Sequence, residues 1–186
     1  MLFLCSRESK GQFSVNQNLN FPASIHSQAE IAQVDSNNYT LEELLENENN
    51  LDFTTLNYPI TDLGFTDKTY WLRFTLENES EQAQTFLLET ARPITDVVHL
   101  YQVSQGKVIL DQLSGDLIKF KDRPFKHRKL IFPITIAANS ASKFYIKYQS
   151  DGEVISLPLL LFWNEGIQFF ILCSLCSIGR SSSFKS

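Results

Sequence analysis

Cysteine is almost absent from this sequence. The chain has three cysteines, Cys5, Cys173 and Cys176, and none lies in the 167 residues between the first two. The central part of the chain therefore needs no disulfide and offers no set of thiolates to a metal. The histidines at positions 26, 99 and 127 also lack the spacing of metal ligands. We predict neither a metal site nor a cofactor.

Catalytic and nucleotide-binding motifs are missing as well. The sequence has no Gly-rich phosphate loop, no G-x-S-x-G elbow and no H-E-x-x-H zinc motif. The formal net charge is −5, and this acidic balance argues against broad nucleic-acid binding. The sequence therefore predicts a protein that is not an enzyme and does not bind nucleic acid.

Long hydrophobic runs are also absent. Residues 1–5 are apolar, but the apolar region of a signal peptide needs about 7–15 residues. Residues 166–178 are apolar over 13 residues, whereas a membrane-spanning helix needs about 20. The Cys173-x-x-Cys176 pair in this run lacks the context of a redox motif. We interpret both ends as truncations, and residues 164–186 as a truncated hydrophobic stub with a polar tail.

Aromatic residues, with 15 Phe and 6 Tyr, are abundant and favour strands over helices. From residue 69 onward, apolar and polar residues alternate with the period of two that is typical of a strand. The expected strands cover residues 69–77, 86–91, 97–103, 107–111, 130–136, 144–148 and 154–163. No long amphipathic helix separates them. This pattern predicts an all-β fold, an antiparallel two-sheet sandwich of the jelly-roll type.

One short helix is expected before these strands, at residues 40–46. Thr40 can cap it, and Glu43 stands three residues later, as in a capping box. Residues 1–38 are polar, and we expect an extended lead-in with at most one strand near Phe21. The predicted organisation is a lead-in at 1–38, a β-sandwich sensing domain at 39–163 and the stub at 164–186.

Several short strings in this region resemble one bacterial family in their order and spacing. They are Leu63-Gly64-Phe65-Thr66, Tyr70-Trp71-Leu72-Arg73-Phe74, Val97-Val98-His99-Leu100-Tyr101, Gly115-Asp116, Arg123-Pro124-Phe125-Lys126-His127-Arg128, Phe132-Pro133 and Ser156-Leu157-Pro158-Leu159. The family is the second type of extracellular domain on seven-transmembrane receptors with diverse intracellular signalling modules. The resemblance implies a jelly-roll domain, similar to carbohydrate-binding modules, on the periplasmic side of the inner membrane. Membrane helices and a kinase or diguanylate cyclase output would follow it.

A basic stretch at residues 119–129 is the first candidate site. Arg123 and Arg128 could bind an anionic ligand, because a guanidinium offers a planar fork to a carboxylate. Asp116 could contact the ligand or pair with Arg123. The alternative interpretation is a solvated loop in which Asp116 is a turn residue.

Trp71 and Arg73 form a second candidate, on one predicted strand face. An aromatic ring beside an Arg suits sugar recognition. In the alternative interpretation, which we favour, Trp71 is a core residue and Arg73 pairs with an acid at the sheet edge. Glu77 and Glu89, expected on neighbouring strands and solvated faces, could be cast as a glycosidase pair, but we predict no catalytic role for them.

We therefore expect a ligand-binding sensor domain of a bacterial signal-transduction receptor, with a sugar or a small carboxylate as its ligand. Such a domain could act as a homodimer. The alternative is a non-catalytic β-sandwich of the cell envelope that binds another protein. An exposed apolar patch would favour a protein partner, and a polar concave pocket would favour a small ligand.

Overall fold

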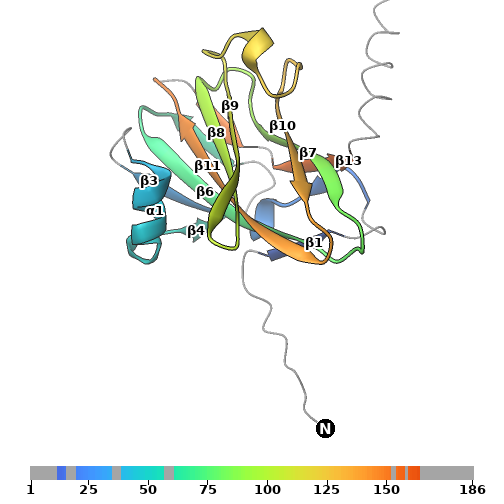
Figure 1. Cartoon of the computed structure of the whole chain (residues 1–186). Coiled ribbons are helices and arrows are strands. Elements are labelled where there is room, and N and C mark those ends of the chain that lie inside the picture. Colours follow the sequence, from blue (N-terminus) through green and yellow to red (C-terminus); the bar gives the residue numbers. More distant parts are fainter. Residues whose placement is uncertain are drawn as a thin grey trace, which may run out of the picture.

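The computed structural model describes residues 12–15, 20–34, 39–56, 61–151, 154–157 and 159–163. Strands dominate these residues, and they form two facing layers (Figure 1). The helical elements are α1 (Leu41–Asn47) and three short 3₁₀ turns, η1 (His26–Gln28), η2 (Glu48–Asn50) and η3 (Phe120–Asp122). No helix among the described residues is long and apolar enough to cross a membrane. The hydrophobic stub and polar tail predicted at residues 164–186 lie outside the described part of the chain.

The larger sheet has the order β4-β3-β6-β11-β8-β9, and β1 also pairs with β6. The strand bounds are β1 (Gln12–Val15), β3 (Glu30–Val34), β4 (Thr54–Thr55), β6 (Thr69–Asn78), β8 (Val97–Ser104), β9 (Lys107–Ser114) and β11 (Ser140–Gln149). β3 runs antiparallel along the first half of β6, and β1 runs parallel along its last four residues. These two short strands together cover one edge of β6.

The smaller sheet has the order β10-β7-β13-β2, and β12 pairs with β5 in a separate two-stranded ribbon. The bounds are β2 (Ala23–Ser24), β5 (Thr61–Phe65), β7 (Gln84–Ala91), β10 (Leu130–Ile136), β12 (Val154–Leu157) and β13 (Leu160–Trp163). The chain crosses between the two sheets from β6 to β7, from β7 to β8, from β9 to β10 and from β10 to β11. The predicted jelly-roll sandwich with a short helix is therefore confirmed.

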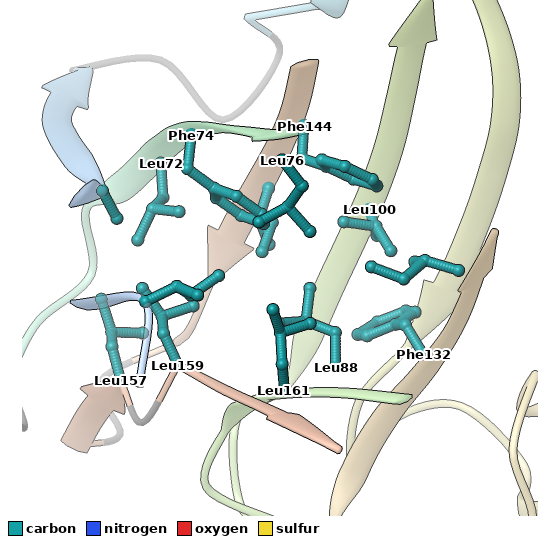
Figure 2. Close-up of a cluster of buried hydrophobic side chains, with 14 of the residues drawn as sticks. Leu72, Phe74, Leu76, Leu88, Leu100, Phe132, Phe144, Leu157, Leu159 and Leu161 are labelled. Atoms are coloured by element: carbon teal, nitrogen blue, oxygen red, sulfur yellow. The ribbon is translucent and has the colours of Figure 1, made fainter. Parts of the chain in front are cut away.

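The main core lies between the two sheets (Figure 2). Alternate residues of β6, namely Leu72, Phe74 and Leu76, point inward and are buried, as the period of two predicts. Phe74 stacks on Phe144 of the neighbouring β11, with ring centroids 5.2 Å apart. The smaller sheet contributes Leu88, Phe132 and Leu161 from the opposite side. Full burial of each such side chain contributes about 1.5–3 kcal/mol to the free energy of unfolding.

A second, smaller core lies on the outer face of the larger sheet. α1 covers this face, and its Leu41 and Leu44 pack against Trp71 and Tyr145. Thr40 caps the helix as predicted: its hydroxyl accepts a hydrogen bond from the Glu43 N–H, and the Glu43 carboxylate accepts one from the Thr40 N–H. Because the cap fixes where the helix begins, it also fixes which helix face meets the sheet.

Three features of the fold differ from the sequence-based expectation. The predicted lead-in contains β1, β2 and β3, so the sandwich begins well before residue 39. These strands have only two to five residues, too few for an alternating apolar pattern to stand out. The apolar run at 154–163 is divided into β12 and β13, which belong to different sheets. β6 and β7, expected as neighbours, also lie in different sheets, because the chain crosses the sandwich between them.

Candidate functional site

The candidate site lies at one end of the sandwich, which we call the loop end. Two connections meet there, the β7–β8 loop at 92–96 and the long β9–β10 loop at 115–129, together with the exit of β11. Figure 1 shows the β9–β10 loop, coloured yellow to gold, rising beyond the strands. The opposite end, which carries the β6–β7 and β10–β11 turns, is called the turn end.

Asp96 ties the loops of this end together. One oxygen of its carboxylate accepts hydrogen bonds from the Asp151 N–H at 2.7 Å and from the Ser150 hydroxyl at 3.3 Å. Its backbone oxygen accepts one from the Leu117 N–H at 3.2 Å. Gly115 permits this approach, because a Cβ at that position would lie 2.1 Å from the Asp96 oxygen and its φ is +137°. The sequence string Gly115-Asp116 therefore marks a close contact between two loops.

The β9–β10 loop is held by bonds within itself. Arg123 Nε donates to the Ile118 oxygen at 3.1 Å, and the Asp122 N–H donates to the Lys119 oxygen at 2.8 Å. The Lys126 ammonium donates to the backbone oxygens of Lys121 and Arg123. These bonds give a loop of 15 residues a defined shape without a regular element beyond the turn η3.

The second half of the loop lies against the outer face of the smaller sheet. Phe125 packs there with Leu87 and Ile131. The Lys129 ammonium donates to the buried Glu89 carboxylate at 2.9 Å. Burial lowers the pKa of His127, and the charges of Lys129 and Arg128 lower it further against the opposing effect of Glu89. His127 is therefore predominantly neutral at pH 7.

Basic side chains without a partner are concentrated at the loop end. Arg92, Lys119, Lys121 and Arg128 are exposed, and their side chains make no hydrogen bond or ion pair with any described residue. Arg123 is different, because only 10% of its side chain is exposed and one Nη lies 4.0 Å from the Asp116 carboxylate. This distance is too long for a hydrogen bond. The loop end thus presents four basic side chains that form no ion pair with a described residue, beside the exposed acids Asp116 and Asp122.

The predicted site residues fall into two groups. Asp116, Arg123 and Arg128 all lie on the β9–β10 loop, and the structure brings the first two together. Trp71 and Arg73 lie on β6, under and beside α1. They are not part of the loop end.

Trp71 has no exposed surface, so its ring offers no face on which a sugar could stack. It packs on Tyr101 with ring centroids 6.0 Å apart. Arg73 bonds the carboxylates of Glu30 and Glu48, each at 2.8 Å, and its guanidinium lies 4.0 Å from the centre of the Phe53 ring. Both residues are placed as the alternative interpretation describes, and we leave them out of the proposed site.

Glu48 is the acceptor that joins the 3₁₀ turn η2 to the sheet. Arg73, Lys143 and Tyr145 all donate to the same oxygen of its carboxylate. Burial raises the pKa of Glu48, but the hydrogen bonds and charges of Lys143 and Arg73 outweigh this effect, and the net pKa lies below its ordinary value. This cluster is a structural tie, because every charge in it is compensated.

A hydrogen-bonded triad on the outer face of the larger sheet was not predicted. His99 on β8 bonds Asp111 on β9 through Nε2, and its Nδ1 lies 2.8 Å from the Tyr101 hydroxyl. Burial and the charge of Asp111 raise the pKa of Tyr101 to about 12. In the sequence, His99 was considered as a metal ligand and lacks the spacing of one, and its contact with Asp111 depends on the strand register.

The glutamate pair considered for glycoside hydrolysis is corrected by the structure. Glu77 lies on β6 and Glu89 on β7, so the two belong to different sheets. Glu89 is buried rather than solvated, and Lys129 holds it. Among the residues that the structure describes, no group of three His, Cys, Asp or Glu side chains is arranged to hold a metal ion.

The fold is a β-sandwich domain in which two connecting loops meet at one end. The chain belongs to the 7TMR-DISM extracellular 2 family, whose model matches residues 26–162. It is therefore an extracellular domain of a seven-transmembrane receptor family, as the ordered strings of the sequence indicated. No curated protein matches the chain.

Solved structures resemble the chain only distantly. A β-glucosidase from Kluyveromyces marxianus in complex with glucose is 11% identical, with a TM-score of 0.43 over 76% of this chain and 16% of its own. The epithelial adhesin 6 A domain from Candida glabrata, in complex with Galβ1-3GlcNAc, is 10% identical, with a TM-score of 0.40 over 79% of this chain and 83% of its own. The TmCBM61 domain in complex with β-1,4-galactotriose is 9% identical, with a TM-score of 0.36 over 75% of this chain and 90% of its own. The chain thus spans about one sixth of the β-glucosidase, and we infer no function from these matches.

Proposed function

We propose that this domain is the ligand-binding sensor of a bacterial receptor, on the periplasmic side of the inner membrane, and that its ligand carries a carboxylate. Membership of a family of extracellular receptor domains supports the sensor role. We infer a carboxylate ligand because several basic side chains at the loop end lack a partner among the described residues. Small carboxylates and sugar acids both have this chemistry.

Arg128 and Arg123 are the groups that we assign to the ligand. Arg128 is exposed and has no bonding partner among the described residues, so its planar fork is available to a carboxylate. Arg123 uses its Nε on a backbone oxygen, and its nearest carboxylate, Asp116, is 4.0 Å away. A ligand carboxylate would compete with Asp116 for this guanidinium. A neutral sugar would leave both positive charges uncompensated.

The loop end is also connected to the strands that could transmit a signal. Asp116 and Leu117 bond the β7–β8 loop through their N–H groups, and Asp96 of that loop bonds the chain just after β11. A ligand that moves the β9–β10 loop therefore acts on β8 and β11, which are neighbours in the larger sheet. Such a signal requires that the protein binds the ligand with different affinities before and after the β9–β10 loop moves.

Thermal unfolding with galacturonate and with galactose tests this function, because the two sugars differ by a carboxylate. We expect galacturonate to raise the Tm and galactose to leave it unchanged, since a ligand stabilises the state that it binds. Arg128→Ala should abolish the shift. Lys107→Ala, an exposed lysine at the turn end, is the matched control. Equal shifts with both sugars, or an unaffected Arg128→Ala variant, would refute the carboxylate assignment.

A protein-interaction module is the second candidate, because an apolar edge supports it. β9 has β8 on one side and no strand on the other within the described sheet. Val108, Ile109 and Leu113 on this strand are 47%, 57% and 39% exposed. A second copy could pack there. Size-exclusion chromatography with light scattering tests this candidate: Ile109→Lys should convert a dimer to a monomer, and a monomeric parent protein would exclude it.

A further inference from the structure

Exposed apolar residues at the loop end indicate a second kind of contact. The described residues include seven exposed large apolar side chains, and three of these lie on the two loops of this end. They are Ile94 on the β7–β8 loop, 44% exposed, and Leu117 and Phe120 on the β9–β10 loop, 70% and 54% exposed. Leu117 is the most exposed of the seven. The Arg123 guanidinium lies 6.0 Å from the centre of the Phe120 ring, but apolar side chains that gather at one end of a domain can mark an interaction surface.

Backbone hydrogen bonds hold these two loops side by side. The Asp116 N–H donates to the Thr95 oxygen at 2.8 Å, and the Leu117 N–H donates to the Asp96 oxygen at 3.2 Å. Ile94 therefore lies on the loop segment that meets Leu117, although 23 residues separate them in the sequence. Phe120 begins the turn η3, which projects beyond the strands as the gold turn in Figure 1. The three side chains thus belong to one end of the protein.

Basic residues are interleaved with these apolar residues. Arg92 precedes Ile94 by two positions, and Lys119 and Lys121 stand on either side of Phe120. None of these three basic side chains has a hydrogen bond or ion pair within the described part of the chain. Lys and Arg can keep the ammonium or guanidinium in a polar layer while their stems follow apolar side chains inward. The exposed acids Asp116 and Asp122 also lie on the β9–β10 loop, but basic residues outnumber acids on the two loops, as in a segment that lies in the interface of a membrane.

We propose that the tips of these two loops dock on an anionic lipid surface. Ile94, Leu117 and Phe120 enter the layer between headgroups and acyl chains, while Arg92, Lys119 and Lys121 contact the lipid phosphates. Each basic residue near such a surface should raise the affinity for it by about fivefold. A second copy of the chain fits this surface less well, because the same unneutralised charges would face each other. The family of this domain belongs to receptors that span a membrane, so a bilayer lies near it.

Co-sedimentation of the full chain with vesicles tests the proposal. Vesicles of phosphatidylcholine with phosphatidylglycerol should bind the protein, and vesicles of phosphatidylcholine alone should not. Binding should weaken as salt is raised, because exposed charges are screened. The double variants Leu117→Ser with Phe120→Ser, and Lys119→Gln with Lys121→Gln, should each lower the affinity by about tenfold or more.

Val108→Ser with Ile109→Ser is the matched control, because it removes two similarly exposed apolar side chains from β9. This variant should bind vesicles as the parent protein does. Equal loss in the control, equal binding to both kinds of vesicle, or no binding at low salt would overturn the proposal. So would a dimer that the Leu117 and Phe120 variant converts to a monomer without changing vesicle binding. Circular dichroism shows whether each variant is folded.

The proposal for the lipid surface and the proposed ligand can fail separately. The galacturonate-dependent rise in Tm is measured without lipid and depends on Arg128. Vesicle binding depends on Leu117, Phe120, Lys119 and Lys121. Loss of vesicle binding with a retained galacturonate shift would leave the sensor function standing.

Discussion

At each end of the sandwich one polar side chain organises the connections, but the two ends differ in the groups that they leave without a partner. At the turn end, the buried Asn78 donates through Nδ2 to the backbone oxygens of Gln82, Ile136 and Ala137, at 2.8, 3.1 and 3.0 Å. Its Oδ1 accepts from the N–H and hydroxyl of Ser80. At the loop end, Asp96 gathers backbone groups in the same way. One polar side chain therefore organises the connections at each end.

The difference lies in what surrounds these two residues. The turn end uses the whole hydrogen-bonding capacity of Asn78, and the bonds join the two turns into one unit. The loop end satisfies its backbone but leaves Arg92, Lys119, Lys121 and Arg128 without partners and Leu117 and Phe120 exposed. Groups that are satisfied internally stabilise the fold, and groups that are not remain available to a ligand or a surface.

Asn78→Ala should have the largest effect on stability. The substitution removes five hydrogen bonds, three of them to backbone oxygens, and should cost about 4 kcal/mol in the free energy of unfolding. Urea denaturation measures this loss. Ser80→Ala, which removes one partner of Asn78 and keeps its bonds to the three backbone oxygens, should cost about 1 kcal/mol. If Asn78→Ala cost no more than Ser80→Ala, Asn78 would not organise the turn end.

Gly115→Ala should have the next largest effect, and it acts at the loop end. A Cβ there meets the Asp96 oxygen at 2.1 Å, so the two loops must separate. We expect a loss of about 3 kcal/mol. Gly106→Ala is the control, because Gly106 also has a positive φ of +72° but no atom within 4 Å of the added Cβ. It should lose only about 1 kcal/mol. Equal losses would mean that the contact with Asp96 does not matter.

Lys129→Ala and Arg128→Ala separate a partnered from an unpartnered basic residue at adjacent positions. Without Lys129, the buried Glu89 carboxylate loses its donor, and the free energy of unfolding should fall by about 2 kcal/mol. Arg128→Ala should change it by less than about 0.5 kcal/mol, because Arg128 has no described partner. Guanidinium chloride melts of both variants give the two values. A larger loss for Arg128→Ala than for Lys129→Ala would contradict the distinction between a partnered Lys129 and an unpartnered Arg128.

The smallest expected effect is a pH dependence of stability to which His127 at the loop end contributes. Because the pKa of His127 is lowered in the folded protein, the unfolded chain takes up the proton more readily. The stability that neutral His127 contributes is present above pH 6.5, the ordinary value, and is lost as the pH falls below it. His127→Gln should reduce the loss of Tm between about pH 7.5 and 5.5. Burial lowers the pKa of His26 as well, so part of the loss should remain. An unchanged pH profile would remove His127 from this account.

Much of the fold could be predicted because burial leaves a pattern in the strand. The alternation of Leu72, Phe74 and Leu76 reports one face of β6 in contact with the core, and the Thr40 and Glu43 pair reports the start of α1. β1 and β3 gave no such signal, because they have only four and five residues. The core position of Trp71 was expected from the sequence, but the element that buries it was not, because α1 is a separate element that covers the outer face of the sheet.

The parts of the site that could be predicted are those set by composition. The basic stretch with Arg123 and Arg128 is visible in the sequence, whereas the bond between Lys129 and Glu89 requires the fold. The His99 and Asp111 contact shows why. The turn at Gln105 and Gly106 pairs Ser104 with Lys107, and an uninterrupted ladder would then place Leu110 opposite Tyr101. A β-bulge shifts the register by one residue and places Asp111 there instead. No sequence pattern announces this bulge.

The burial of Asn78 has a consequence for production of the protein in eukaryotic cells. Asn78-Glu79-Ser80 matches the acceptor pattern for N-glycosylation, but the nitrogen that would carry the glycan is the one that donates to three backbone oxygens. A glycan and the folded turn exclude each other at this residue. Chains secreted through an endoplasmic reticulum would be divided by which event comes first: those modified before the β6–β7 turn closes would be retained as misfolded, and those that fold first would leave unmodified.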